Sequence, residues 1–280
     1  MQFFMMRIML NPRSADAYLG IRRGAPRDRE AWLRDIFGRD ITFQHRGAGF
    51  HYVPLPEVAN PEVMVGRVGR QVVGVENQPP EAYFRETEHV GWRAALVLID
   101  PRSHANGQLI AGEMLTDVGK PLSVMASLAQ SINMREPAEP YFMDVNAITA
   151  AQTFWAFEEE NRGHIVDITF DLHVPNMFGI RDDLDKELKE LRDNEKARRA
   201  KLQIQNEDGL NLQTDRVKTT VEHTIDGGGA IKARTVDNKR FNSRRLVQRK
   251  TVDVDLPSDK QPASFAVRVG RAIRGIFSDE

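Results

Sequence analysis

The sequence predicts an α+β fold, with a β-rich N-terminal half followed by a βαβαββ-like α+β sandwich. Two observations carry this prediction. Before Lys120, short apolar runs rich in β-branched residues are separated by glycine and proline, which is the pattern of strands and turns. Beyond that point, apolar residues spaced three or four apart alternate with runs of period two, so helices and strands are expected to follow one another.

In the N-terminal half, a strand is expected wherever an apolar run is bounded by glycine, proline or a polar turn. Gly69, between two β-branched runs, indicates a hairpin turn over 67–71. A short helix is expected at 28–37, and 100–107 has the composition of a turn. The predicted strands are 3–10, 41–45, 50–53, 64–68, 71–75, 94–99 and 109–114.

Helical spacing begins behind Pro121, where Leu122, Met125, Leu128 and Ile132 recur every three or four residues. After this helix the pattern alternates between the two periods. The expected series is a strand at 141–147, a helix at 149–163, a strand at 164–174, a helix at 182–201, a strand at 202–205, a helix at 215–224 and a ribbon that starts at the triple glycine 227–229.

The helix expected at 182–201 has a characteristic charge order. Aspartates such as Asp182 lie near its N-terminus, and Arg198, Arg199 and Lys201 lie near its C-terminus. This order complements the helix dipole and therefore supports the predicted helix.

The elements divide the chain into three expected parts. Residues 1–148 form the β-rich N-terminal domain, and 149–252 form the α+β domain with the basic β-ribbon. Residues 253–280 form a linker, rich in Asp, Pro, Ser and Lys, and a basic amphipathic tail.

Composition excludes several classes of protein. The chain has 280 residues, 41% of them hydrophobic, which is enough for a substantial core. No apolar run approaches the roughly 20 residues that span a bilayer. The start of the chain lacks the features of a signal peptide, and the sequence has no cysteine for disulfides or thiolate chemistry. A cytoplasmic location is therefore expected.

The most informative segment is the basic ribbon at 227–250. It concentrates eight basic residues against the single acidic Asp237, although the net charge of the whole chain is only −1. Segregated positive charge attracts polyanions, so we expect the ribbon to contact DNA or RNA phosphates, with Phe241 stacking on a base. The predicted nucleic-acid-binding residues are Lys232, Arg234, Lys239, Arg240, Phe241, Arg244, Arg245, Arg249 and Lys250.

Two other interpretations of the ribbon stay open. Lysine and arginine also protect a solvated sheet edge from aggregation. In addition, the acidic helix that begins at Asp182 could pair with the ribbon and neutralise its charge within the molecule.

No catalytic residue, cofactor site or metal site is predicted. Asp100 and Glu113 flank a predicted turn and could hold a nuclease magnesium, but the lysine expected after the second carboxylate is missing. His45 and His51 lie in a glycine-rich region without cysteine or paired carboxylates, so surface histidines are the better interpretation. The triple glycine precedes a strand rather than a helix, which favours a bend or bulge over a phosphate loop.

The C-terminal segment 265–277 has arginines on one helical face and apolar residues on the other. Three uses are expected for it: docking on a partner protein or a second copy, a disordered tail, or contact with an anionic membrane surface.

The stretches 152–155, 159–170, 174–176 and 227–234 resemble a family of uncharacterised bacterial proteins loosely associated with mobile elements and phage defence. The similarity covers most of residues 90–250. It implies no catalytic residues, because the shared motifs have a structural character. The general layout also resembles phage-exclusion proteins that bind DNA as dimers, a likeness of architecture alone.

The sequence therefore supports three functional hypotheses. The first is a non-enzymatic nucleic-acid-binding component of a bacterial anti-phage defence system that self-associates. The second is a protein-interaction or scaffold subunit whose ribbon meets an acidic partner. The third is a metal-dependent nuclease that uses Asp100 and Glu113.

Overall fold

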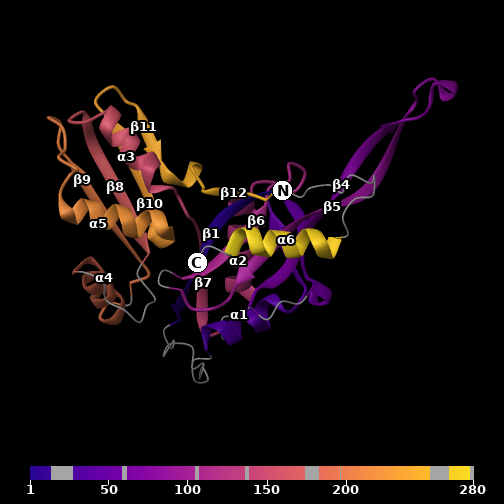
Figure 1. Cartoon of the computed structure of the whole chain (residues 1–280), viewed down its shortest axis with the longest axis horizontal. Coiled ribbons are helices and arrows are strands. Elements are labelled where there is room, and N and C mark those ends of the chain that lie inside the picture. Colours follow the sequence, from indigo (N-terminus) through magenta and orange to yellow (C-terminus); the bar gives the residue numbers. More distant parts are fainter. Residues whose placement is uncertain are drawn as a thin grey trace.

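The computed structural model describes residues 1–13, 28–58, 62–104, 107–135, 139–173, 183–195, 197–252 and 265–277. These residues form two antiparallel sheets with helices packed on them (Figure 1), so the predicted α+β class is confirmed.

The first sheet is built around β1 (Gln2–Pro12). One edge of β1 pairs with β6 (Gln108–Glu113), and its other edge pairs first with β12 (Arg249–Thr251) and then with β7 (Tyr141–Ala147). The remaining strands follow β6 in the order β5, β4, β3, β2. Their bounds are β2 Ile41–His45, β3 Ala48–Pro54, β4 Met64–Asn77 and β5 Glu86–Asp100.

Both faces of the first sheet are covered, which explains why β1 is apolar along almost its whole length. One face packs on α1 (Arg29–Phe37) and α2 (Pro121–Arg135). The other face packs on α6 (Phe265–Phe277). The side chain of Asp28 caps α1 by accepting a 3.2 Å hydrogen bond from the Ala31 amide, as a helix start requires.

The predicted hairpin turn at 67–71 is wrong, because β4 runs through it without a break and pairs with β5 over its full length. Gly69 has a different role. A Cβ there would lie 2.9 Å from the carbonyl oxygen of Arg93, so glycine permits close strand pairing rather than a turn. The outer parts of β4 and β5 leave the sheet as a two-stranded arm (Figure 1).

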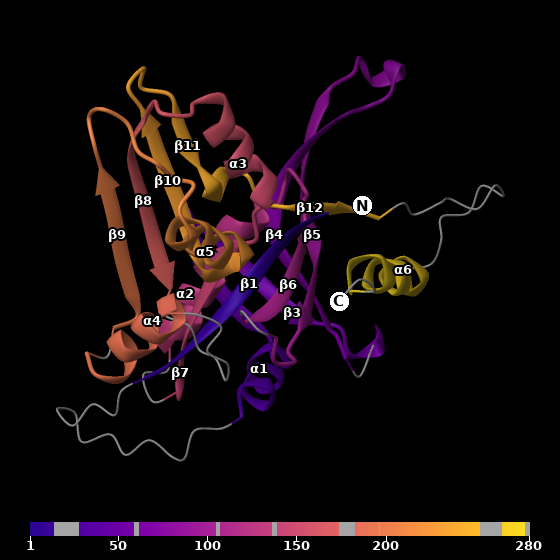
Figure 2. The same ribbon diagram turned by 60° about the vertical axis from the view of Figure 1, so that its left-hand side comes forward.

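The second sheet has the order β11-β10-β8-β9. Its chain order β8-α4-β9-α5-β10-β11 matches the predicted βαβαββ series. Helices α3 and α5 lie over one face of the sheet (Figure 2), where the second core is formed. The bounds are β8 Ile165–His173, β9 Arg199–Gln205, β10 Gly229–Thr235, β11 Arg240–Asn242, α3 Ala151–Glu160, α4 Asp183–Asp193 and α5 Asp215–His223.

One boundary in this sheet differs from the prediction. The acidic helix ends at Asp193, and Arg199 and Lys201 belong to β9 rather than to the end of the helix. Apolar residues alternate with these cations, and Leu202 and Ile204 pack on the core. Burial of the apolar face that contains Leu202 and Ile204 explains why these residues form a strand rather than the end of the helix.

Arg7 links the two sheets. Its buried guanidinium donates to the carbonyl oxygen of Gly107 and to both the carbonyl and the carboxylate of Asp226, in the short helical turn Thr224–Gly228 that precedes β10. Gly227 has φ +94° in that turn, and a Cβ there would lie 2.3 Å from Cγ of Arg7. The triple glycine thus forms a bend at the entrance of β10, as expected from the sequence.

The segment 265–277 is helix α6, and its apolar side is covered by the first sheet. Val269, Ala272 and Ile276 are buried there. The apolar side predicted to meet a partner or a membrane is therefore packed within the chain. The linker at 253–264 lies outside the described residues. Among the described residues, none of the helices combines the length and the apolar character that a membrane-spanning helix needs.

Candidate nucleic-acid interface

The uncovered face of the second sheet collects basic side chains. In β10, Ile231 and Ala233 point into the core, so Lys232 and Arg234 point to the opposite side, where both are exposed. The same alternation occurs in β11 and β9. Phe241 of β11 and Leu202 and Ile204 of β9 face the core, so the residues between them point to the uncovered face.

We name this surface the basic face. Its six cations come from β9, β10, β11 and the short 3₁₀ turn Ser243–Arg245, and all six are exposed. Strands lie about 4.8 Å apart, so the four strands span roughly 14 Å. The cations of the basic face are Arg199, Lys201, Lys232, Arg234, Arg240 and Arg244.

Two aspartates of β8 lie within the basic face without cancelling its charge. Asp171 accepts a 2.8 Å hydrogen bond from Arg244 and so fixes that guanidinium. Asp167 accepts hydrogen bonds from two glutamines of β9 and lies 3.9 Å from Arg234. Lys201 and Lys232 have no acidic partner among the residues that the structure describes. The face keeps an excess of positive charge.

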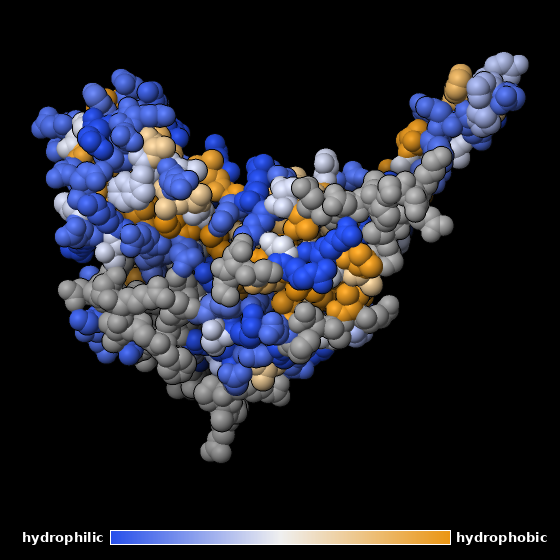
Figure 3. Space-filling model, viewed as in Figure 1, coloured by the Kyte–Doolittle hydropathy of each residue, from blue (hydrophilic) through white to orange (hydrophobic). Residues whose placement is uncertain are grey.

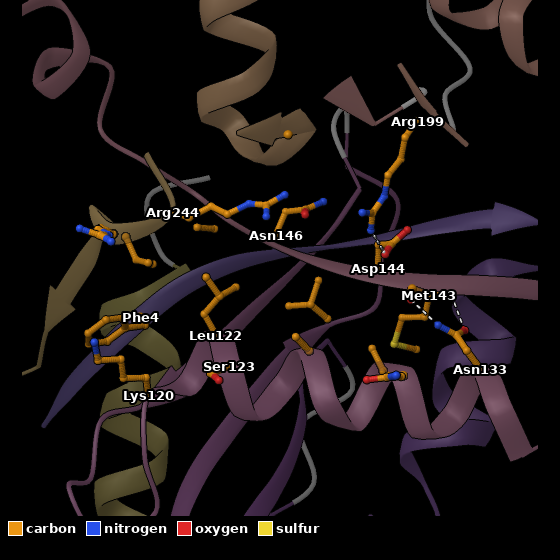
Figure 4. Close-up of a pocket in the computed structure, with 18 of the residues that line it drawn as sticks. Phe4, Lys120, Leu122, Ser123, Asn133, Met143, Asp144, Asn146, Arg199 and Arg244 are labelled. Atoms are coloured by element: carbon orange, nitrogen blue, oxygen red, sulfur yellow. Dashed lines mark hydrogen bonds and ion pairs between the residues drawn. The ribbon is translucent and has the colours of Figure 1, made fainter. Parts of the chain in front are cut away.

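The basic face continues into a cleft of about 1140 Å³ between the second sheet and the surface formed by β7 and α2. Figure 4 shows Arg199 and Arg244 on one side of the cleft, with Leu122 and Ser123 of α2 opposite them. The cations that line the cleft are Lys120, Arg199, Arg244, Arg245 and Arg249.

The floor of the cleft is mostly apolar and contains few acidic groups. Phe142 and Met143 of β7 contribute to it, and Asp144 is the one acidic residue in the described lining. The Asp144 carboxylate accepts a 2.8 Å hydrogen bond from Arg199. The side-chain amide nitrogen of Asn146 is buried and has no hydrogen-bond partner. The cleft therefore combines positive charge with an apolar surface.

The structure divides the predicted ribbon residues into three groups. Lys232, Arg234, Arg240 and Arg244 lie on the basic face, and Arg245 and Arg249 line the cleft. Lys239, Phe241 and Lys250 lie elsewhere. The ribbon is also shorter than expected, because β10 pairs with β11 only over three residues and β12 returns to the first sheet.

The prediction that Phe241 stacks on a base is wrong. Its side chain is 6% exposed, and its ring centroid lies 5.4 Å from those of Phe154 and Phe157. Neighbouring residues in a strand point to opposite faces, so Phe241 must face the core when Arg240 and Asn242 face outward.

Lys239 and Lys250 have structural contacts. The Lys239 ammonium lies 3.3 Å from the amide oxygen of Asn161 at the end of α3, on the helix side of the sheet. The Lys250 ammonium donates a 2.8 Å hydrogen bond to the carbonyl of Ile276, near the end of α6. The basic face therefore excludes Lys239 and Lys250 of the predicted ribbon but includes Arg199 and Lys201 of β9, which lie outside it.

Sequence reasoning missed Lys120, Arg199 and Lys201. The alternation of polar and apolar residues over 199–205 was a detectable signal for two of them, since it is the pattern of a strand with one buried face. For Lys120 no signal was present, because only the packing of α2 against β7 brings it to the cleft.

The described side chains of the acidic helix are directed away from the basic face. Leu188 of α4 is buried in the core on the helix side of the sheet, and Glu187 lies 3.7 Å from Arg216 of α5. Glu187 is thus separated from the basic face by the thickness of the sheet, whereas Asp182, at the predicted start of the helix, lies outside the described residues.

The structure does not bring together the residues of the other candidate sites. Asp100 is buried between Arg102 and His104 and lies opposite Leu109, four positions along β6 from Glu113. His45 of β2 faces the core and contacts Ser127. His51 of β3 is on the opposite face of the sheet, next to Trp92. No group of three metal-ligating side chains occurs among the residues described.

His173, at the end of β8 beside the cleft, gives a prediction about acid stability. Its side chain is 1% exposed, neither ring nitrogen has a hydrogen bond, and burial lowers its pKa to about 4 despite Asp144 at 3.7 Å. The unfolded chain binds a proton near pH 6.5, and the native state does not until about pH 4.

The free energy of unfolding is therefore unaffected by protonation of His173 above pH 6.5. It falls as the pH drops toward 4, by up to about 3 kcal/mol, because only the unfolded chain takes up the proton. Urea unfolding at pH 7, 5.5 and 4.5 measures the loss. We expect His173→Leu to flatten the dependence on pH. An unchanged slope in that variant would show that other groups cause the acid sensitivity.

Comparisons of the chain with known protein families, curated proteins and solved structures found no match.

Proposed function

We propose that the protein binds nucleic acid through the phosphate backbone, with the basic face and the cations of the cleft as the contact surface. One observation supports this most: nine cations gather on one continuous surface of a chain whose net charge is −1. A local positive field of this kind recruits polyanions.

The chemistry of the surface favours contacts that do not depend on sequence. Most of its donors are guanidinium groups, which bind phosphates in a bidentate manner. The outward positions of the described strands in the second sheet hold no Phe, Tyr or Trp that could stack on a base. The bound groups are therefore phosphates rather than base edges.

Titration of the chain against labelled duplex DNA, single-stranded DNA and RNA tests the proposal. If the six cations of the basic face each neutralise one phosphate, log K for a duplex should fall with log salt with a slope of about −5. Duplexes of different sequence should bind equally. Absence of binding to all three probes at about 50 mM salt would refute the proposal.

A second candidate function is the protein-interaction role, favoured by the arm formed by β4 and β5. Its exposed apolar side chains have no role in phosphate binding. The anti-phage role and a cytoplasmic location stay predictions from the sequence.

A further inference from the structure

The arm, defined here as residues 71–92, carries an unusual amount of exposed apolar surface. Val73, Val75, Val90 and Trp92 are 58 to 65% exposed. Strand pairing places Val73 opposite Val90, and Trp92 lies two residues from Val90 on the same side of the ribbon. These four side chains therefore lie on one side of the arm and stay more than half exposed. Figure 3 shows the arm projecting from the body of the molecule, with apolar residues among its polar surface.

The tip of the arm displays two aromatic side chains. Tyr83 is 92% and Phe84 61% exposed, and both have positive φ angles, 57° and 53°. Aromatic residues rarely adopt this backbone conformation, which costs on the order of 1 kcal/mol or more for each residue. A two-stranded ribbon is only marginally stable by itself in water. A surface that receives the tip would account for both features.

Charge narrows the choice of partner. The arm contains Glu76, Glu81, Glu86 and Glu88 against the single Arg85, a net charge of −3 with histidine neutral. None of these glutamates forms an ion pair with a described residue. This charge disfavours nucleic acids and anionic membranes. The cleft has five cations and one acid in its lining, a net charge of +4, above an apolar floor.

A second copy of this chain carries both the acidic arm and a basic cleft, and the area that each contact could bury indicates which of its parts the arm would contact. Two arms stacked on their apolar sides would share a footprint of roughly 24 by 10 Å, about 240 Å². Stable interfaces bury about 800 Å² on each partner. The arm must therefore reach the body of the other molecule to bury enough surface.

We propose that the arm docks into the cleft of a second copy of this chain. Tyr83 and Phe84 lie against the apolar floor near Leu122 and Phe142, and the glutamates of the arm pair with the cations of the cleft. Exchange of arms between two copies makes both contacts at once and gives a closed dimer. The same cations then serve either the arm or a nucleic acid.

The oligomeric state, measured by sedimentation equilibrium without nucleic acid, tests this proposal separately from phosphate binding. We expect a dimer at tens of micromolar that weakens with salt. Tyr83→Ser with Phe84→Ser should raise the dissociation constant at least tenfold, because it removes the proposed apolar contact with the cleft. The fold should be little affected, since both side chains are more than half exposed. A wild-type monomer, or a dimer that the double variant leaves intact, would overturn the proposal.

Charge exchange identifies the two surfaces that meet. One variant carries Glu81, Glu86 and Glu88 replaced by Lys, and the other carries Lys120, Arg245 and Arg249 replaced by Glu. Each should be monomeric alone, and their mixture should form a heterodimer because both contacts regain opposite charges. The control replaces three exposed glutamates on the helix side of the second sheet or its loops, Glu159, Glu207 and Glu222, by Lys. Failure of the mixture to associate would refute docking in the cleft.

Discussion

Replacing four cations of the proposed interface by glutamate should lower the affinity for a 20-base-pair duplex at least 100-fold at about 100 mM salt. The four are Lys201, Lys232, Arg240 and Arg245, which have no acidic partner among the described residues. Their reversal therefore removes phosphate contacts without breaking an ion pair. The salt slope should become shallower by about 3.6, because each of the four contacts releases about 0.9 counterion. Fluorescence anisotropy at several salt concentrations measures both quantities.

A matched control separates local contacts from net charge. Lys186, Lys189, Lys218 and Lys239 lie on the helix side of the second sheet, and their replacement by glutamate changes the net charge by the same amount. Long-range effects of charge are screened within about 10 Å at this salt concentration. The control should bind within a few-fold of the unmodified chain. Equal losses in the two variants would mean that no particular surface carries the binding.

The replacement Arg7→Ala should lower the free energy of unfolding by about 3 kcal/mol. Arg7 is almost fully buried, and its guanidinium satisfies the Gly107 carbonyl and two oxygens of Asp226. Its loss leaves the buried Gly107 carbonyl without this donor, breaks the ion pair with the half-buried Asp226 and opens a cavity where the sheets meet. The melting temperature should fall by about 6 to 12 °C. Denaturant unfolding followed by circular dichroism measures the change.

An exposed pair provides the control for Arg7. Arg39 forms an ion pair with Asp35 four residues earlier, and both side chains are about half exposed. Arg39→Ala should cost less than about 1 kcal/mol, because surface pairs contribute little. If Arg7→Ala cost no more than this, Arg7 would not be the link that holds the basic face next to the cleft.

The elements themselves could be predicted from local patterns. The alternation in 165–173 and 229–235 and the helical spacing after Pro121 each depend on residues close in sequence, and the structure has strands and a helix at these places. The errors arose where one local pattern fitted two structures. Gly69 fits a turn or a close strand pair, and the cations at 199–201 fit the end of a helix or an edge strand.

Residue types and short-range periodicity are sufficient to predict the class of the fold and the excess of positive charge near the C-terminus. The tertiary structure decided which cations share a surface. Arg199 and Lys232 meet on one face only because β8 lies between β9 and β10. That strand order is selected by burial of the apolar sides of all four strands at once, a long-range condition that no local pattern contains.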